Sequence, residues 1–171
     1  MFVCSGNTCR SPLAWAAWQV VVRQAPPAQR AWLQSVAVSS AGLNARAGAP
    51  ASELARRVAA RWDVDLSGHR ARPWNGQGAR ADWIVAMTGA QVAQMRFALE
   101  TRAPAAVAPR VRALGLPVAD GDESKWPSLF RPGQTNDIFD PYGGSFEAYE
   151  ECGARILRGV RALALELSEA R

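Results

Sequence analysis

Apolar residues recur along the chain in two alternating patterns: short continuous runs, and positions spaced as on one side of a helix. The run at 83–87 is continuous, 2–3 is a short stub, 36–39 ends in Ser39, and 111–114 is interrupted by Arg112. Short apolar runs of this kind are typical of parallel strands that are covered on both faces. We therefore predict four strands, the first of them short because only three residues precede Cys4.

Helical spacing fills the intervals between these runs. The first helix is expected to begin near Pro12, because a first turn tolerates proline, with Ser11 as its N-cap, and to end ahead of Pro26. Three further helices are predicted over 52–62, 91–99 and 145–169. The alternation favours an α/β fold, a single four-stranded parallel sheet with helices on both faces, in which ligands bind beyond the carboxyl ends of the strands.

Composition and charge limit the classes of protein that fit this pattern. About half of the 171 residues are hydrophobic and no repeat or linker divides them, which predicts one domain over 1–171. No apolar run approaches the ~20 residues that span a bilayer, and no secretion signal is recognisable, so we expect a cytoplasmic protein without a membrane partner. The net charge of +5 comes from scattered arginines rather than a basic stripe, so no nucleic-acid partner is expected. We also expect no metal or cofactor, and a monomer or weak homodimer.

The main chemical signal is the polar segment Cys4-Ser5-Gly6-Asn7-Thr8-Cys9-Arg10-Ser11, between the first strand and the first helix. Gly6 gives the backbone freedom to turn N–H groups inward, and the helix adds its partial positive end, so the segment suits a phosphate dianion. The planar guanidinium of Arg10 can hold two phosphate oxygens. The same positive field favours the thiolate of Cys4, an activated nucleophile. For Ser11, a hydrogen bond to the sulfur and a purely structural cap both stay open.

Displacement of phosphate from an alcohol, phenol or guanidine requires a proton donor near the loop. Asp140 is the best candidate because it precedes the rigid turn Pro141-Tyr142-Gly143-Gly144, in which Tyr142 would line the wall of the site. The alternative is that Asp140 only starts this turn, as aspartate often does. Asp137 and Asp122 are the rival acids.

Five ordered motifs resemble the low-molecular-weight protein tyrosine phosphatase family. They are FVCSGNTCRSP at 2–12, VSSAG at 38–42, DLSGHRAR at 65–72, ADWIVAMT at 81–88 and DPYGGS at 140–145. The resemblance implies that Cys4 is the nucleophile, Arg10 the phosphate clamp, Ser11 the thiolate partner and Asp140 the general acid. It implies that the other loop residues surround the substrate phosphate: Ser5, Gly6, Asn7, Thr8 and Cys9.

The resemblance also implies contacts that support the loop. Asn7 is expected to be held by Ser40 and His69 in a polar network that keeps the loop in a strained shape. For His69, a surface turn residue is the alternative. Cys9 resembles the family's second loop cysteine, which can form a disulfide with the nucleophile. Cys152, on the apolar face of the last helix, is expected to be a small core residue.

Residues around the loop bear on the substrate, which the resemblance implies to be a phosphorylated protein. Phosphotyrosine is the first expectation. Thr8 and Gly143-Gly144 resemble the protein-arginine-phosphatase branch, so phosphoarginine is the alternative. Arg46 stands where the family often has an aromatic residue beside the substrate ring, and Tyr142 would contact a phenyl ring or a guanidinium equally well.

Two other functional classes fit the sequence less well. Thioredoxin-coupled arsenate reductases share the loop and fold but need further cysteines in a mobile segment, and residues 10–151 contain no cysteine. A phosphopeptide-binding module without turnover is disfavoured because Cys4, Arg10 and Asp140 are all present. The segment 116–139, rich in Pro, Gly, Asp and Ser, is predicted to be a long loop ahead of Asp140.

Overall fold

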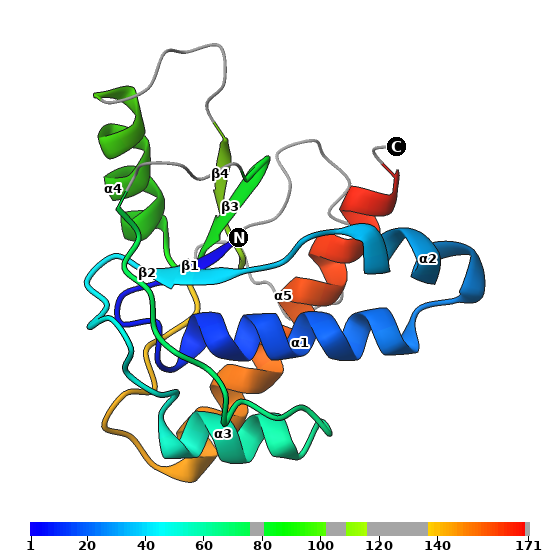
Figure 1. The fold of residues 1–171 in the computed structure, drawn as a ribbon, viewed down its shortest axis with the longest axis horizontal. Helices are drawn as coiled ribbons and strands as arrows, with labels where there is room; N and C mark the ends of the chain where they lie inside the picture. Colours follow the sequence, from blue (N-terminus) through cyan, green and yellow to red (C-terminus); the bar gives the residue numbers. More distant parts are fainter. Residues whose placement is uncertain (76–80, 102–108, 116–136, 170–171) are drawn as a thin grey trace.

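The computed structural model describes residues 1–75, 81–101, 109–115 and 137–169, and its described strands form one parallel sheet. The strands are β1 (Phe2–Cys4), β2 (Ser40–Gly42), β3 (Trp83–Ala86) and β4 (Arg110–Ala113). Their order across the sheet is β2-β1-β3-β4, so the short first strand lies in the middle (Figure 1). The predicted four-stranded parallel sheet is confirmed.

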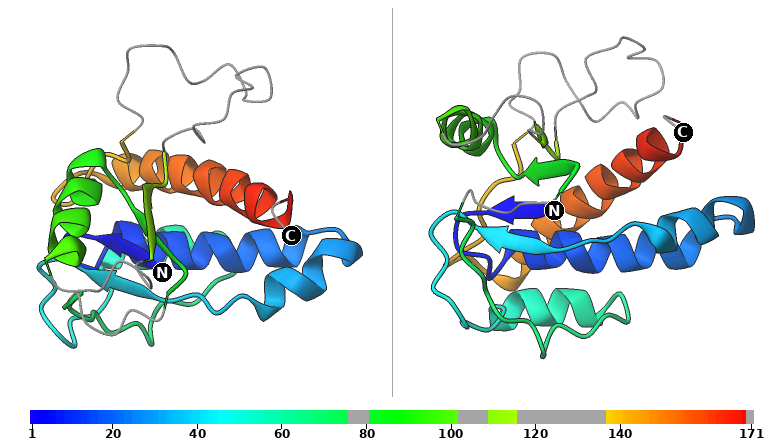
Figure 2. Two further views of the ribbon diagram at one scale, coloured as in Figure 1. Left: turned by 90° about the horizontal axis from the view of Figure 1, so that it is seen from above. Right: turned by 45° about the horizontal axis from the view of Figure 1, so that its top comes forward.

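Helices cover both faces of this sheet (Figure 2). One face carries α1 (Arg10–Gln24), α3 (Glu53–Ala60) and the long α5 (Phe146–Glu169), and α4 (Gly89–Glu100) covers the other. The short α2 (Pro27–Ser35) follows α1. Within the described helices, none is long and apolar enough to cross a membrane.

The continuous apolar runs have a physical explanation in this arrangement. Successive residues of a strand point to opposite faces, and here each face meets a hydrophobic cluster. Phe2 and Val85 pack with α1 and α5, whereas Val3 and Ile84 pack with α4. Because both faces of the inner strands β1 and β3 are covered, these two strands show no alternation of apolar and polar residues. The edge strand β4 does alternate: Arg110 is exposed, whereas Val111 and Ala113 are buried.

Two boundary predictions are wrong. The second strand begins at Ser40 rather than at Val36, because β1 offers only three residues and its partners in the ladder are Ser40, Ala41 and Gly42. The helical pattern does end at Pro26, but a second, unpredicted helix begins directly after it. Pro27 occupies the first helical position of α2, where its missing N–H costs nothing.

The N-cap prediction for Ser11 is also wrong. α1 begins at Arg10, its N-cap is Cys9, and no side chain caps it. Ser11 lies inside the first turn, fully buried, and its hydroxyl is used elsewhere. Of the long loop predicted over 116–139, residues 116–136 lie outside the described residues.

Candidate active site

Cys4 is the last residue of β1, at the carboxyl end of the central strand, and its sulfur is buried in a ring of polar groups. The Asn7 backbone N–H donates to Cys4 Sγ at 3.3 Å, and Ser11 Oγ lies 3.1 Å from the same sulfur. Ser11 has one hydrogen and two acceptors within reach, Cys4 Sγ and the Ala41 carbonyl oxygen at 3.3 Å. When the sulfur is a thiolate, both Asn7 and Ser11 can donate to it, which stabilises the charged form.

Asn7 holds the loop in shape. Its φ of 54° places its backbone in the left-handed region, which residues other than glycine seldom adopt unless neighbouring contacts hold them there. Asn7 Nδ2 donates to Ser11 Oγ at 2.8 Å and to Ser40 Oγ at 3.0 Å, and Asn7 Oδ1 accepts from the Arg72 backbone N–H at 2.9 Å. The Asn7 carbonyl accepts from His69 Nε2 at 2.7 Å. The expected contacts of Asn7 with Ser40 and His69 are therefore both present.

The conformational argument for Gly6 is wrong. The residue of the loop with positive φ is Asn7, while Gly6 is not among the glycines with positive φ. A Cβ added at Gly6 would lie 3.4 Å from Thr8 Oγ1, an ordinary van der Waals contact, so close packing does not require a glycine here either. Asparagine enters the left-handed region more readily than most residues because its short polar side chain forms local hydrogen bonds.

His69 keeps its neutral form in this network. The Asn7 carbonyl can only accept, so His69 Nε2 carries the hydrogen. Burial lowers the pKa of His69, and the nearby Arg72 and Arg70 lower it further, against the opposing effect of the Asn7 hydrogen bond. The neutral ring therefore suits the environment at neutral pH.

Mild acid is expected to destabilise the fold through His69. In the unfolded chain His69 binds a proton as the pH falls through about 6.5, whereas the folded chain resists protonation to lower pH. Stability is thus lost as the pH falls below 6.5. Urea unfolding at about pH 7.5 and 6.0 measures this, and His69→Gln, which keeps an N–H for Asn7, should reduce the difference. Burial also lowers the pKa of the Met1 amine to about 6, so that group contributes equally to the difference in both proteins. A difference that His69→Gln leaves unchanged would contradict the assignment to His69.

The end of β2 backs the loop so closely that only glycine fits. The Leu43 and Asn44 N–H groups donate to the carbonyls of Cys4 and Ser5, both at 2.9 Å. A Cβ on Gly42 would lie 2.7 Å from the Ser5 carbonyl oxygen and 2.8 Å from the Asn7 nitrogen. Both are backbone atoms, which cannot rotate away.

Gly42→Ala is therefore expected to displace the loop and lower kcat/KM by about tenfold or more, because small misplacements of reacting groups are costly. Overpacking of this kind also costs about 1–3 kcal/mol of stability. Gly68→Ala is the matched control, since nothing lies within 4 Å of its added Cβ and its φ is not positive. Equal activities of the two variants would show that the close approach has no role in the site.

Arg10 and Asp140 meet over the loop although they are far apart in sequence. Arg10 is 4% exposed and forms an ion pair through Nη2 with the Asp140 carboxylate, which is about half exposed. Arg10 Nη2 also donates to Ser5 Oγ at 3.4 Å, and Nη1 to the Ile138 carbonyl at 3.2 Å. Arg10 Nε is buried and, among the described residues, has no hydrogen-bond partner. A buried donor without a partner is rare, and here it leaves part of the guanidinium free for an anion.

Asp140 also starts the turn that follows it. Its Oδ1 accepts from the Tyr142 N–H at 3.2 Å, Pro141 is buried, and Gly143 has a φ of 78°. The turn-forming alternative and a role beside Arg10 are thus compatible. Of the rival acids, Asp137 accepts from the Gly89 N–H at the start of α4 at 2.8 Å, and Asp122 lies outside the described residues.

Cys9 lies on the side of the loop that faces α5. Its sulfur contacts the hydroxyl groups of Tyr149 at 3.1 Å, Ser52 at 3.4 Å and Thr8 at 3.6 Å. Burial and the hydrogen bond with Cys9 together raise the pKa of Tyr149 to about 12, so this hydroxyl stays neutral. Cys4 and Cys9 are both free thiols. Burial likewise raises the pKa of Cys152 to about 12, which fits a small core residue.

Two residues predicted to contact substrate lie on the surface. Tyr142 is 77% exposed beside Asp140, and Arg46 is exposed in the turn that follows β2. Sequence reasoning missed residues whose side chains touch the loop, among them Gln91, Ser52 and Tyr149. One feature of the sequence could have pointed to Gln91: it is a polar residue four positions after Met87, which ends the predicted strand 83–87. No such feature points to Ser52 or Tyr149.

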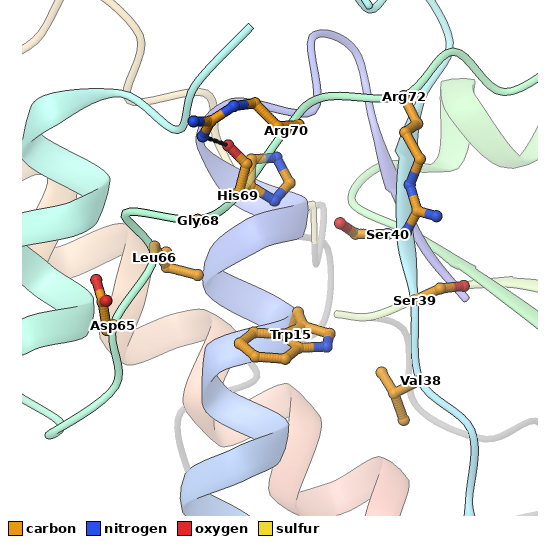
Figure 3. A pocket seen from close by; sticks show the side chains of 10 residues that line it. All are labelled: Trp15, Val38, Ser39, Ser40, Asp65, Leu66, Gly68, His69, Arg70 and Arg72. Atoms are coloured by element: carbon orange, nitrogen blue, oxygen red, sulfur yellow. Dashed lines mark hydrogen bonds between the residues drawn. The ribbon is translucent and has the colours of Figure 1, made fainter. Parts of the chain in front are cut away.

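A cavity of about 540 Å³ borders the network that supports the loop. Figure 3 shows Trp15 of α1 at its base, Val38 and Ser39 on one side, and Ser40 and His69 near the loop. Cys4, Arg10 and Asp140 are not among the residues that line this cavity. The cavity therefore lies next to the supporting contacts and apart from the candidate nucleophile.

Comparison with known proteins identifies the family. Residues 1–120 match the family model described as low molecular weight phosphotyrosine protein phosphatase. The chain belongs to this family. The resemblance that the five motifs indicate is thus confirmed, and with it the class of enzyme, a phosphatase that acts on phosphorylated proteins.

Relatives of this phosphatase include both branches considered above. It is 37% identical over 165 residues to the probable low molecular weight protein-tyrosine-phosphatase EpsP of Ralstonia solanacearum, covering 95% of this chain and 90% of that protein. It is 30% identical over 152 residues to a protein-arginine-phosphatase of Geobacillus stearothermophilus, covering 87% and 82%.

Solved structures show the same division. The tyrosine phosphatase Wzb from Escherichia coli K30, in complex with sulphate, superposes with a TM-score of 0.70 at 25% identity, covering 97% of this phosphatase and 95% of that chain. The YwlE arginine phosphatase from Geobacillus stearothermophilus superposes with a TM-score of 0.68 at 27% identity, covering 99% and 92%. The predicted fold is confirmed by both.

Proposed function

We propose that the chain hydrolyses phosphotyrosine in proteins through a phosphocysteine intermediate on Cys4. The observation that carries this proposal is the meeting of three groups at the carboxyl end of β1. These are the Cys4 sulfur with its two hydrogen-bonding partners, the partly unpaired guanidinium of Arg10, and the Asp140 carboxylate. Together they supply the nucleophile, the anion clamp and the acid that phosphate transfer requires.

In the first step the Cys4 thiolate attacks phosphorus, the S–P bond forms, and the bond to the tyrosine oxygen breaks. Arg10 binds the non-bridging oxygens, and Asp140 gives its proton to the departing oxygen. A phosphate dianion must share Arg10 with Asp140, which now pairs with Nη2. The dianion weakens this ion pair and adds negative charge beside the carboxyl group, and both changes favour the protonated acid that the step needs.

In the second step water attacks phosphorus and the S–P bond breaks, releasing inorganic phosphate. Asp140, left ionised by the first step, takes the proton of the attacking water. The departing thiolate accepts hydrogen bonds from the Asn7 N–H and the Ser11 hydroxyl, 3.3 and 3.1 Å away. Ser11 thus acts on the leaving sulfur in this step.

Phosphoarginine is the second candidate substrate. It is favoured by Thr8 in the loop and by the relationship to a protein-arginine-phosphatase. Thr8 is half-buried, and its hydroxyl contacts Cys9 Sγ at 3.6 Å. Tyr142 is exposed beside the acid, where it can stack on a phenyl ring or a guanidinium.

A side-by-side assay of phosphotyrosine and phosphoarginine peptides tests the substrate. We expect the higher kcat/KM for phosphotyrosine. Thr8→Ile removes one hydroxyl, so it should move the ratio further toward phosphotyrosine by about tenfold, the worth of one hydrogen bond. The opposite preference in the wild type would assign the chain to phosphoarginine, and a ratio that Thr8→Ile leaves unchanged would remove Thr8 as its determinant.

A further inference from the structure

Gln91 lies in the first turn of α4, yet its side chain reaches the phosphate-binding loop. The residue is 7% exposed, and two contacts fix the orientation of its amide. The Met87 backbone N–H can only donate, so the atom 3.0 Å away is the amide oxygen of Gln91. Gln91 Nε2 therefore faces Ser5 Oγ, at 3.1 Å, and donates to it.

Two donors thus converge on the Ser5 hydroxyl. Gln91 Nε2 is one, and Arg10 Nη2, at 3.4 Å, is the other. Neither nitrogen can accept a hydrogen bond, and a serine hydroxyl has two lone pairs and one hydrogen. With both lone pairs engaged, the Ser5 hydrogen points away from Gln91 and Arg10 and is left to be donated.

We propose that Gln91 is a positioning residue, which orients Ser5 so that its hydroxyl donates to a phosphate oxygen beside Arg10. This inference rests on the proposed binding of phosphate in the loop. Ser5 directly follows Cys4 in the loop, and its hydroxyl lies 3.4 Å from Arg10 Nη2, so it stands beside the clamp. A donor fixed before the substrate arrives costs no reorganisation when the charge on the phosphate shifts.

The connection between β3 and α4, residues 87–91, also contacts the segment that leads to Asp140. The Met87 carbonyl accepts from the Ile138 N–H at 2.8 Å, and the Gly89 N–H donates to Asp137 Oδ1 at 2.8 Å. Residues 87–91 therefore contact the loop on one side and the segment leading to Asp140 on the other. Gln91 is the residue through which this connection reaches Ser5.

Gln91→Glu tests the proposal because it keeps the shape of the side chain and replaces the donor by an acceptor. The Ser5 hydroxyl should then donate to the new carboxylate, and the inhibition constant of inorganic phosphate should rise about tenfold, the effect of losing one charge-assisted hydrogen bond. The loss should shrink at lower pH, where the carboxyl group is protonated. Gln94→Glu, on the exposed side of α4, adds the same charge without a contact to the loop and should have little effect.

Ser5→Ala separates orientation from simple charge repulsion. If Gln91 acts through Ser5, then Gln91→Glu adds little further loss in the Ser5→Ala background, because contacting residues that act together are not additive. A full additional loss in that background, or no loss in the single variant, would overturn the role of Gln91. Wild-type turnover that depends on Cys4 is measured first, so failure of this test leaves the proposed function standing. Absence of that turnover would instead remove the function, and the inference with it.

Discussion

Cys4→Ser is expected to abolish phosphatase turnover, lowering kcat by at least about 10⁴-fold, since loss of a covalent nucleophile has effects of this order. A serine hydroxyl is not ionised at neutral pH, so the Asn7 N–H and Ser11, which now face the sulfur, have no anion to stabilise. The loop itself should survive, because its shape depends on Asn7, Ser40 and His69. Inorganic phosphate should therefore still raise the Tm of the variant.

Cys152→Ala is the matched control for the loss of a buried thiol. Its sulfur lies in the core and donates weakly to the Phe139 carbonyl at 3.6 Å. We expect this variant to retain most of the wild-type activity. Turnover that survived Cys4→Ser, with Cys152→Ala unaffected, would place the nucleophile on another residue.

Asp140→Asn is expected to have the second largest effect, a loss of about 10²–10³-fold in kcat/KM for aryl phosphates with poor leaving groups, as is typical for a general acid. The loss in kcat/KM, which reports the first step, should be much smaller for a nitrophenyl phosphate, whose leaving group needs little protonation. The amide keeps an oxygen for the Tyr142 N–H, so the turn should persist. A plot of log(kcat/KM) against leaving-group pKa for both proteins measures the effect.

Asp137→Asn is the control for this plot. Asp137 stands three residues earlier on the same segment, but its carboxylate is used at the amino terminus of α4. It should lower stability slightly, by about 0.5–1 kcal/mol, without changing the slope. If the slope changed in Asp137→Asn and not in Asp140→Asn, the acid would have to be reassigned.

Local patterns were sufficient to predict the sheet and the loop. The apolar runs at 2–3 and 83–87 predicted buried parallel strands because both faces of the sheet are covered. The cysteine and arginine of the loop were identified because the chemistry of phosphate binding constrains their spacing. Such features depend on residues that are close in sequence.

Other features depend on pairing that no local pattern records. β2 begins at Ser40 because β1 is only three residues long and can pair with no more than three residues. The apolar sequence that begins at Val36 does not indicate this limit. Pro27 both ends one helix pattern and begins another, so its local preference was ambiguous. Gln91 and Tyr149 reach Ser5 and Cys9 across 86 and 140 residues, which only the tertiary structure brings together.

The phosphocysteine on Cys4 is tested most directly by rapid denaturing quench during steady-state turnover of a nitrophenyl phosphate, followed by mass spectrometry of the peptide that contains Cys4. With such a substrate the second step should limit the rate, so the intermediate accumulates. We predict one phosphoryl group on Cys4 in the wild type and none in Cys4→Ser. A phosphoryl group on any other side chain, or turnover with an initial burst but no modified Cys4, would contradict this mechanism.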